Sequence, residues 1–513
     1  MLNPEQQKAA ETIEGPLLIT AGAGTGKTFT LINRVGQIIK SKKITTNQVL
    51  ILTFTNKAAH ELTERLVKNK YFGIQVMTFH SLAAKLLRKF WKIDFTINDD
   101  EDPETLNFDQ LLTKILETWT DNPKSLKKSQ KLFKYIMVDE YQDVNTEQIK
   151  IITKLVENHK NICVVGDEDQ TIYSWRGAHA STMNNFVKIF PKTQNIVLQQ
   201  NYRNPPNILK ASEELIINNK DRTPKILQST KIQNQKTKLW KSNNPWEQSE
   251  IISHLLEKYL GSHSNMVDAD YLDNENQETN YSFSDIAFIY RTQEQGKKIA
   301  VKLEKRGYPC QRSAADNFWK KAEINQFINE LKPLINLPKF PKKSFSEWIQ
   351  DRIDEFINNQ EIPNHKQTNL NLLLSIAINF NHQKIKTALQ NFLDEAETSQ
   401  EADNLIKPNA IQLLTFHAAK GLEFPIVIIL DLNEEIIPHK QSLGDGYLIS
   451  EERRLLYVGM TRATENLHLI TNTKKPKSRF LEEIKTYDLG ALPSERTQKL
   501  KKRELKRRQP SLF

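Results

Sequence analysis

A glycine-rich segment near the N-terminus restricts the fold of this chain more than any other feature. It lies between a short apolar run, residues 17–20, and a stretch with helical periodicity, residues 31–39. Its eight residues are Ala21, Gly22, Ala23, Gly24, Thr25, Gly26, Lys27 and Thr28. Glycines between a strand and a helix let backbone N–H groups approach phosphates, and the helix N-terminus favours the anion. We therefore predict an α/β core that cradles nucleotide phosphates, although Ala21 stands where the strict pattern has glycine.

Within this cradle, Lys27 is expected to supply a positive charge and Thr28 a ligand for Mg²⁺. A second motif adds carboxylates, because the apolar run 135–138 ends in Asp139 and Glu140. In phosphoryl transfer, one such carboxylate holds Mg²⁺ and another polarises the attacking water. We assign the first role to Asp139 and the second to Glu140. Without the cradle, the same pair would be an ordinary acidic strand end that faces solvent.

Short apolar, β-branched runs alternate with helical periodicity, which predicts an α/β fold with parallel sheets. The first set of expected strands is Leu17–Thr20, Val49–Phe54, Gln75–Phe79, Ile136–Asp139, Ile162–Val165 and Ile196–Gln199. The second set is Ile286–Tyr290, Ile411–Phe416, Pro425–Asp431 and Leu467–Thr471. At 59.5 kDa the chain is too long for one hydrophobic core, so two to four domains are expected.

Two stretches interrupt the α/β pattern, and each is predicted to be an inserted helical subdomain. Residues 89–132 are polar, rich in lysine and helical in character, and residues 326–404 show helical patterns without convincing strands. The expected α/β units are therefore residues 1–88 with 133–205, and residues 206–325 with 405–485. The polar segment Ser262–Tyr281 is expected to be a surface loop. Residues 486–513 remain as a basic, disordered tail.

The composition excludes several classes of protein. Cys163 and Cys310 are the two cysteines, which excludes a disulfide framework, a four-cysteine zinc site and an iron–sulfur cluster held within the chain. No apolar run approaches the length of a membrane span, and the N-terminus is not a signal peptide, so a cytoplasmic protein without membrane partners is expected. The net charge of +10 is concentrated in residues 496–508, which suits either a solvated end or an arm for nucleic acid.

Further motifs are spread along the chain, before and after the first two. They lie at residues 2–6, 53–59, 78–81, 139–143, 165–178, 201–203, 415–424 and 451–463. Together they resemble the motifs of superfamily 1 helicases of the UvrD/Rep type, over nearly the whole chain. The resemblance implies two RecA-like P-loop motor domains with parallel sheets, each carrying a helical insertion. It also implies an ATP-dependent 3′→5′ DNA helicase that acts on single-stranded and tailed duplex DNA, in DNA repair or replication restart.

The resemblance also implies roles around the nucleotide. Arg203 and Arg462 would act as arginine fingers on the γ-phosphate, because their planar charged forks suit a loose phosphoryl transition state. Gln170 would sense the γ-phosphate. Three further residues would hold the base and the ribose. Gln6 would contact adenine, Tyr202 would stack on it, and Glu423 would lie near the ribose. Phe29 stands where relatives often have Arg beside adenine; an aromatic ring can also stack, with a looser base preference.

The same resemblance implies a path for single-stranded DNA. Aromatic faces stack bases without selecting a sequence, and short polar groups suit phosphates. The aromatic candidates are Phe54, Tyr173 and Trp175, and the polar candidates are Thr55, Asn56, Thr78, His80 and His417. A lone aromatic is more often a core residue. Here Trp175 follows Gln170 by five residues, so ATP sensing and base stacking could move together.

Residues 326–404 are shorter than the duplex-contacting insertion of relatives, so a single-strand translocase that removes bound proteins and unwinds poorly is a second hypothesis. A third is a clamp-associated binding module with a vestigial ATP site, against which Lys27, Glu140, Arg203 and Arg462 argue. The last five residues resemble the peptide by which bacterial proteins dock on the replication sliding clamp. In that reading Gln509, Leu512 and Phe513 would bind the clamp, while Pro510 departs from the usual Leu.

Overall fold

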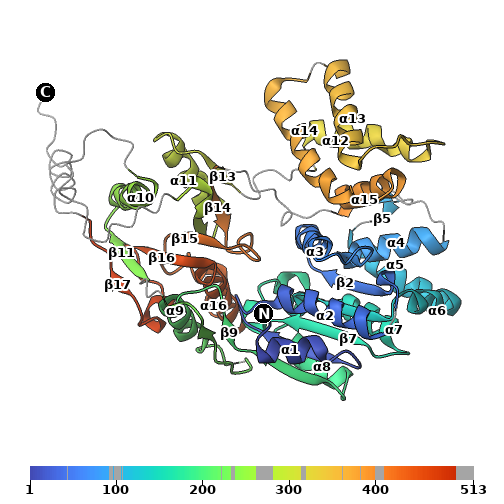
Figure 1. Ribbon diagram of the computed structural model, residues 1–513. Coiled ribbons are helices and arrows are strands. Elements are labelled where there is room, and N and C mark those ends of the chain that lie inside the picture. The colour runs from blue at the N-terminus through green and yellow to red at the C-terminus, as the bar shows by residue number, and fades with distance from the viewer. Residues whose placement is uncertain are drawn as a thin grey trace, which may run out of the picture.

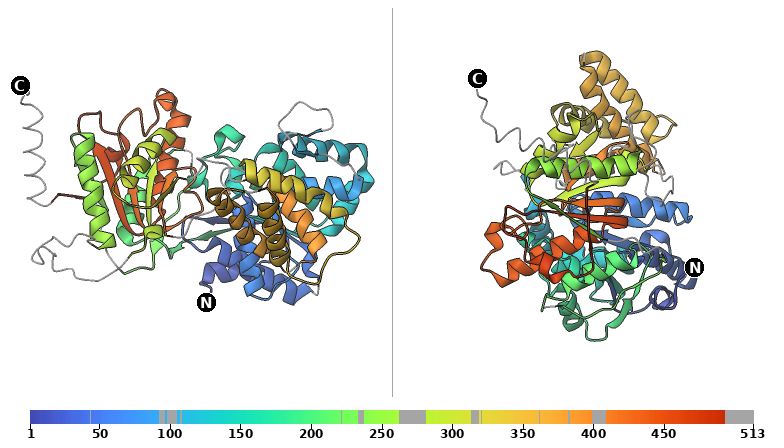
Figure 2. Two further views of the ribbon diagram at one scale, coloured as in Figure 1. Left: turned by 90° about the horizontal axis from the view of Figure 1, so that it is seen from above. Right: turned by 90° about the vertical axis from the view of Figure 1, so that its left-hand side faces the viewer.

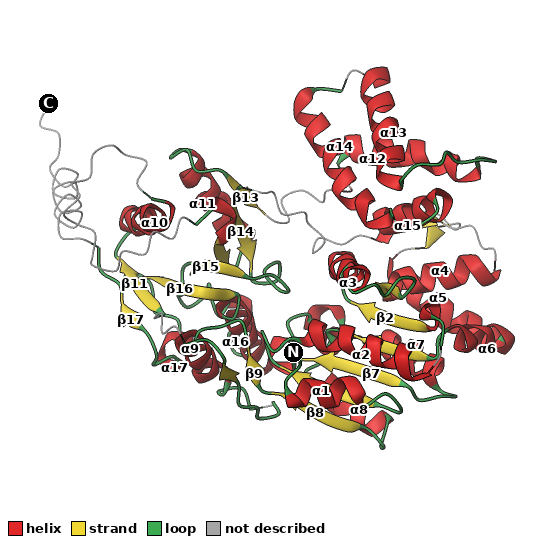
Figure 3. Cartoon of the chain, in the orientation of Figure 1, coloured by secondary structure: helices red, strands yellow, loops and turns green. Residues whose placement is uncertain are grey.

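The computed structural model shows two parallel sheets, side by side, with helices on both faces of each (Figures 1 and 3). It describes residues 1–42, 44–91, 96–97, 105–106, 108–220, 222–232, 237–261, 281–312, 319, 321–360, 362–381, 383–398 and 409–492. Residues 262–280 of the expected surface loop Ser262–Tyr281, and the candidate clamp peptide, lie outside these residues. No helix in the described part of the chain is long and apolar enough to cross a membrane.

The first sheet has the strand order β3-β2-β6-β7-β1-β8, and all of its pairings are parallel. Its strands are β1 (Leu17–Ala21), β2 (Val49–Thr53), β3 (Gln75–Thr78), β6 (Tyr135–Val138), β7 (Ile162–Gly166) and β8 (Gln194–Leu198). Alternate residues of the central strands enter two different core clusters, one on each face. That two-sided burial explains why the strands are continuous apolar runs.

Helices cover both faces of this sheet. One face holds α1 (Pro4–Glu11), α2 (Lys27–Lys42) and α3 (Asn56–Lys68), and the other holds α4 (Phe79–Trp91), α5 (Phe108–Asp121), α6 (Pro123–Leu132), α7 (Thr146–Val156) and α8 (Thr182–Ile189). Leu111, Ile115 and Trp119 of α5 are buried in the same cluster as Leu50 of β2. The structure here differs from the expected separate insertion at 89–132, because the apolar face of α5 completes the core of the first sheet.

The second sheet has the order β13-β14-β12-β15-β16-β11-β17, again parallel throughout. Its strands are β11 (Lys238–Ser242), β12 (Ile286–Tyr290), β13 (Cys310–Arg312), β14 (Ile411–Thr415), β15 (Phe424–Ile429), β16 (Ala463–Asn472) and β17 (Asp488–Leu489). Its helices are α9 (Pro206–Ile216), α10 (Pro245–Leu260), α11 (Gln293–Glu304), α16 (Gly446–Met460) and α17 (Phe480–Glu483). The predicted α/β class with two parallel sheets is confirmed.

Between β13 and β14, the chain leaves the second sheet and forms a helical unit with its own core. Its helices are α12 (Ala322–Leu331), α13 (Phe345–Gln360), α14 (Asn364–Ala377) and α15 (Ile385–Thr398). This unit lies over the first sheet's side of the molecule (Figures 1 and 2). Asp394 pairs with Arg88 of α4, and Glu395 pairs with His60 of α3. The unit is therefore inserted in the chain of the second sheet, and it contacts helices of the first sheet.

A tight packing contact in the second core yields a test of the fold. A Cβ added at Gly459 of α16 would lie 2.6 Å from Cε1 of Phe416, whereas one added at Gly446 of the same helix would meet nothing within 4 Å. Because the ring sits in a packed core, we expect Gly459→Ala to cost about 1–3 kcal/mol of stability. Gly446→Ala is the matched control and should leave stability unchanged or slightly higher. Thermal unfolding measures both, and equal melting temperatures for the two variants would contradict the packing described.

Candidate nucleotide and DNA site

The glycine-rich segment forms a turn between β1 and α2. Ala21 is the last residue of β1, so its extended backbone accepts a side chain where the strict pattern has glycine. Gly24 and Gly26 have positive φ angles of 70° and 80°. A Cβ on Gly24 would lie 2.5 Å from Cβ of Arg203, and one on Gly26 would lie 2.7 Å from Nε2 of Gln6. These two positions require glycine for both conformation and space.

The predicted lysine and carboxylates meet at the carboxyl ends of β1 and β6. Lys27 Nζ lies 3.0 Å from Glu140 Oε1. Burial of the ammonium opposes a rise in the pKa of Lys27, but the carboxylates of Glu140, Asp139 and Asp167 outweigh it and raise that pKa. Burial and the neighbouring Glu140 raise the pKa of Asp139. For Glu140, the charges of Lys27 and Lys420 overcome burial and lower the pKa.

Glu140 has a left-handed backbone, with φ of 51° and ψ of 44°. A non-glycine residue in this region is strained, and such strain is concentrated at functional sites. Gln142 donates from Nε2 to Glu140 Oε2, and its Oε1 accepts a bond of 2.9 Å from the Asp167 backbone. The carboxylate of Glu140 is therefore held on two sides, by Lys27 and by Gln142.

The donor set fits a bound magnesium ion. Thr28 and Asp139 both line one cavity of about 790 Å³, together with Lys27, Glu140 and Asp143. Hydroxyl and carboxylate oxygens are ligands that Mg²⁺ prefers. The raised pKa of Asp139 means that a cation here would also release a proton from that carboxyl group.

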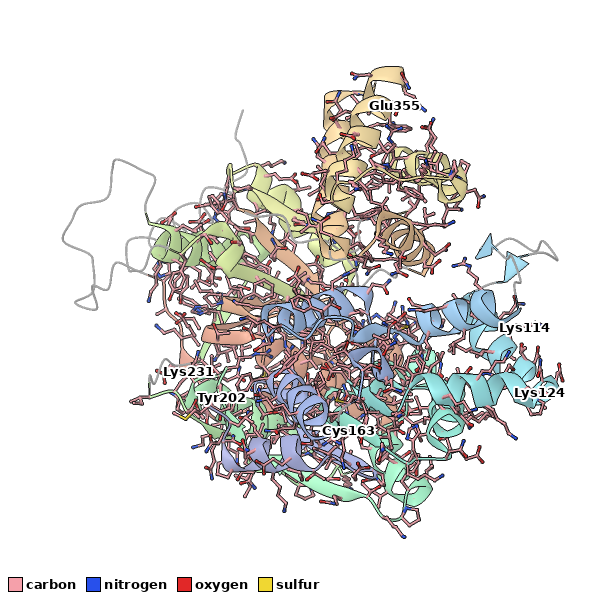
Figure 4. The ribbon with its side chains drawn as sticks, turned by 45° about the vertical axis from the view of Figure 1, so that its right-hand side comes forward. Lys114, Lys124, Cys163, Tyr202, Lys231 and Glu355 are labelled. Atoms are coloured by element: carbon pink, nitrogen blue, oxygen red, sulfur yellow. The ribbon has the colours of Figure 1, made fainter. Side chains whose placement is uncertain are left out.

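The cavity lies between the two sheets. The second sheet contributes Lys420, Leu422, Glu423 and Arg462 to its lining, and the segment that joins the sheets contributes Tyr202, Arg203 and Lys231. Figure 4 shows Tyr202 and Lys231 on the same side of the molecule. A ligand in this cavity would therefore touch both halves of the chain.

Both predicted arginine fingers lie at this cavity, and both are held by protein groups. Arg203 Nε donates to Glu423 Oε2 at 2.7 Å. Arg462 is 2% exposed and donates from Nε to the Val458 carbonyl at 2.9 Å and from Nη2 to Gln170 Oε1 at 3.1 Å. Burial and the charge of Arg203 lower the pKa of Arg462 to about 9, so its guanidinium remains charged at neutral pH.

Gln170 connects the two halves. Its Nε2 donates to Asp167 Oδ2 at 2.6 Å while its Oε1 accepts from Arg462, and its backbone carbonyl accepts from Lys420 Nζ at 2.7 Å. The sequence predicted Gln170 and Arg462 as site residues, and the structure brings them into contact.

Lys420 was not among the predicted site residues, yet it bridges the two sheets. It follows β14, and its Nζ pairs with Asp143 Oδ2, which follows β6. Asp143 is buried, and burial raises its pKa to about 6 against the opposing charge of Lys420. The signal in the sequence was a lysine inside the motif at residues 415–424.

The residues predicted to bind the adenine base do not all lie at the cavity. Tyr202 and Phe29 are 42% and 45% exposed and line the cavity. Gln6 is 1% exposed and is not among the lining residues. It accepts from the Asn3 backbone at 3.1 Å and donates to the Thr25 carbonyl at 3.0 Å. In this structure Gln6 supports the phosphate loop from behind.

The aromatic candidates form one cluster with unequal exposure. Phe54 and Tyr173 stack with ring centroids 4.9 Å apart, and Tyr173 is 5% exposed within the core of the second sheet. Trp175 is 66% exposed, with the Arg176 guanidinium 4.4 Å from its ring centroid. Of the three, Trp175 is the most exposed ring.

The polar candidates lie around the same cluster. Thr55 caps α3 by accepting from the Ala58 backbone at 3.1 Å, and Thr78 accepts from the Ser81 backbone at 3.2 Å at the start of α4. Asn56 is 6% exposed. Both helix N-termini therefore face the region that follows the strands β2 and β3, where anions are favoured.

Both histidines in this region are neutral at physiological pH. Burial and the nearby Arg176 lower the pKa of His80 to about 3. Burial and the charges of Arg291 and Lys420 lower the pKa of His417 to about 4. They can therefore offer hydrogen bonds to DNA but no positive charge.

A buried charge network anchors segment 167–176, and no pattern in the sequence indicated it. Lys225 contacts both Asp167 and Asp169, while Arg222 forms two bonds of 2.9 and 2.8 Å to Asp169. The Ser174 backbone donates to Glu451 of α16 at 3.1 Å. The chain between the nucleotide cavity and Trp175 is thereby held against the second sheet's helices.

Comparison with known proteins agrees with this geometry. Residues 2–102 and 96–191 match the family model described as the UvrD/REP helicase N-terminal domain, and residues 196–364 and 342–474 match the UvrD-like helicase C-terminal domain. The chain is 29% identical to the ATP-dependent DNA helicase PcrA of Bacillus subtilis, over 94% of this chain and 85% of that one. It is 28% identical to PcrA of Staphylococcus aureus, over 94% and 86%. The first alignment runs over 650 positions, more than the 513 residues of this chain, so parts of the relative have no counterpart here.

The contact between Lys420 and Asp143 can be tested by a double-mutant cycle. Lys420→Met leaves the Asp143 carboxylate buried without its partner, which costs up to about 3–5 kcal/mol for a fully buried pair. Asp143→Asn in the same chain removes the stranded charge, so the double variant should recover much of that loss. Chemical denaturation of the four proteins measures the coupling. Strictly additive effects would show that the pair does not link the halves.

Proposed function

Because the chain belongs to the UvrD/REP helicase family, we propose that it is an ATP-dependent DNA helicase that moves 3′→5′ along single-stranded DNA and unwinds duplex. The observation that carries the proposal is the position of residues 167–176. One end of this segment contacts Arg462 and Lys420 at the nucleotide cavity, and its other end presents Trp175. A change at the nucleotide can therefore move a base-stacking ring.

Each residue at the cavity has a defined task in the proposed reaction. Lys27 and the N-terminus of α2 bind the phosphates of ATP. Thr28 and Asp139 would hold Mg²⁺, which would neutralise developing charge on the phosphates. Glu140, fixed by Gln142, orients and polarises the attacking water. This assignment requires Lys27 to exchange its contact with Glu140 for the phosphates.

Arg203 and Arg462 stabilise the charge of the transition state from the other side. Arg462 already lies at Gln170, whereas Arg203 must leave Glu423 to reach the γ-phosphate. Glu423 is then available to the ribose. Because these groups lie on both sides of the cavity, ATP binding draws the sheets together and hydrolysis releases them.

The base of ATP is held by Tyr202 and Phe29, the exposed rings at the cavity. Gln6 contributes to adenine recognition only after its amide turns from the Thr25 carbonyl, so its first effect is on the shape of the phosphate loop. We infer that stacking on these two rings adds to the affinity for a nucleotide whichever base it carries.

Single-stranded DNA binds across the carboxyl ends of both sheets. Trp175, supported by Phe54 and Tyr173, stacks a base, and the N-termini of α3 and α4, with Thr55, Asn56, Thr78 and His80, contact phosphates together with His417. These contacts identify no sequence, as a motor that passes every nucleotide requires. The direction of movement rests on the family resemblance, as does a role in DNA repair or replication restart in the cytoplasm.

A second candidate is a translocase that strips proteins from single strands and unwinds poorly. It is favoured by the exposed face of α13 in the helical unit, where Glu347, Asp351, Asp354 and Glu355 lie. Lys343 and Arg352 neutralise part of this face. The remaining negative charge repels a DNA backbone, so this unit is a poor site for duplex.

The decisive measurement is ATP hydrolysis and strand displacement on duplexes with 3′ or 5′ single-stranded tails. We expect hydrolysis that single strands stimulate, and displacement that requires the 3′ tail. Lys27→Ala should reduce hydrolysis by about 100-fold or more, because the phosphates lose their main positive charge. Hydrolysis without displacement would favour the translocase. A chain without stimulated hydrolysis, or with unaffected Lys27→Ala activity, would refute the proposal.

The clamp peptide at Gln509, Leu512 and Phe513 remains a separate proposal, since it lies outside the described residues. A terminal apolar pair suits a hydrophobic pocket, and Gln adds polar contacts. We expect deletion of residues 509–513 to abolish binding to a bacterial sliding clamp in a titration, while hydrolysis on single strands stays the same. Equal clamp affinity of the shortened and full-length chains would exclude the peptide.

A further inference from the structure

Helix α6 presents a face of lysines that the proposed motor does not use. Lys124, Lys127, Lys128 and Lys131 are spaced i, i+3, i+4 and i+7, so they lie on one side of the helix. All four are exposed, while Ser125, Ser129 and Gln130 are buried on the opposite side. We call these four residues the lysine face.

The four ammonium groups of the lysine face have no ion-pair partner in the described part of the chain. The sequence of α6 contains no acidic residue. Like charges three and four residues apart destabilise a helix. The nearest acids in sequence are Asp121, at the end of α5, and Glu117, which lies 3.7 Å from Lys114.

The position of the lysine face separates it from the motor track. The chain runs from α6 directly into the amino end of β6, whereas Thr55 and Thr78 follow the carboxyl ends of β2 and β3. A four-residue strand spans roughly 13 Å. The C-terminal end of α6 therefore lies at the amino ends of the parallel strands, and the track lies at their carboxyl ends. Figure 4 shows Lys124 at the outer margin of the molecule, beside Lys114 of α5, and Figure 1 shows α6 at the same margin.

We propose that the lysine face is a docking surface for the phosphate backbone of duplex DNA that lies outside the motor track. The inference rests on the proposed helicase function. Lys124 and Lys131 are about 10.5 Å apart along the helix axis, close to the major groove's width of about 12 Å. The ends of the face can thus reach phosphates on both sides of one groove.

The charge distribution elsewhere supports duplex as the occupant. The exposed face of α13, in the helical unit, is acidic and repels a polyanion. The lysine face is an array of positive charge on one helix, without an ion pair to any described residue. Contacts of this kind bind backbone without selecting sequence, and each neutralised phosphate steepens the salt dependence of binding by about 0.9.

The test compares affinities for a 3′-tailed duplex and for its single-stranded tail alone, between 50 and 200 mM salt. The variant replaces Lys124, Lys127, Lys128 and Lys131 by Gln. The matched control replaces four exposed lysines of the second half by Gln: Lys297, Lys298, Lys305 and Lys474. We expect the salt slope for the tailed duplex to fall by about 3–4 in the first variant only, with the slope for the tail unchanged. Replacement of the same four lysines by Arg should retain the slope.

An unchanged duplex slope in the lysine-face variant would overturn the inference. So would an equal fall for the tail alone, which would assign the face to single strands, or an equal fall in the control, which would show an effect of net charge. Because the four side chains are exposed, an unchanged melting temperature confirms that the variant is folded. Failure of the unmodified chain to bind the tail would instead refute the proposed function.

Discussion

The ion pair between Lys420 and Asp143 joins two sheets that otherwise have separate cores. Each partner follows the carboxyl end of a strand, one in each sheet, and the side chains of Lys420 and Asp143 are 8% and 0% exposed. The free energy lost when two charges leave water can exceed the free energy that their attraction returns. Such a pair therefore contributes less to stability than to the choice of one arrangement of the two sheets. Here it holds the halves at a separation that places Gln170 against Arg462. The geometry of the nucleotide cavity depends on that arrangement.

Segment 167–176 belongs chemically to both halves. Its acids Asp167 and Asp169 are neutralised by Lys225 and Arg222, which come from the chain that enters the second sheet. Tyr173 is packed in the second sheet's core, although the segment directly follows β7 of the first. A segment that is fixed at both ends transmits displacement, because packed cores deform little.

The sequence predicted all six strands of the first sheet, including its edge strands β3 and β8, but missed β11 and the edge strands β13 and β17 of the second sheet. Strands such as β1 and β12 are buried on both faces, so their apolar runs are unmistakable. β13 has only three partly buried residues, and β17 has two exposed ones, so neither shows a pattern to detect. The helix α5 was assigned to an insertion because its surroundings are polar, yet its apolar face fills the core beneath β2. Most site residues inside motifs were found. Lys420 and Glu451, which lie inside motifs, and Lys225, which does not, were missed, because their roles arise from contacts between distant parts of the chain.

The helical unit α12–α15 has a mechanical consequence. Its two chain connections lead to β13 and β14 of the second sheet, while Asp394 and Glu395 rest on α4 and α3 of the first. The same two helices begin directly after Thr78 and Thr55, two of the residues proposed to contact single-stranded DNA. Any rotation of one sheet against the other must therefore either shear these ion pairs or bend the connections. The unit would therefore resist rotation of one sheet against the other, and breaking its contacts with α3 and α4 would add to the free energy that such a rotation requires.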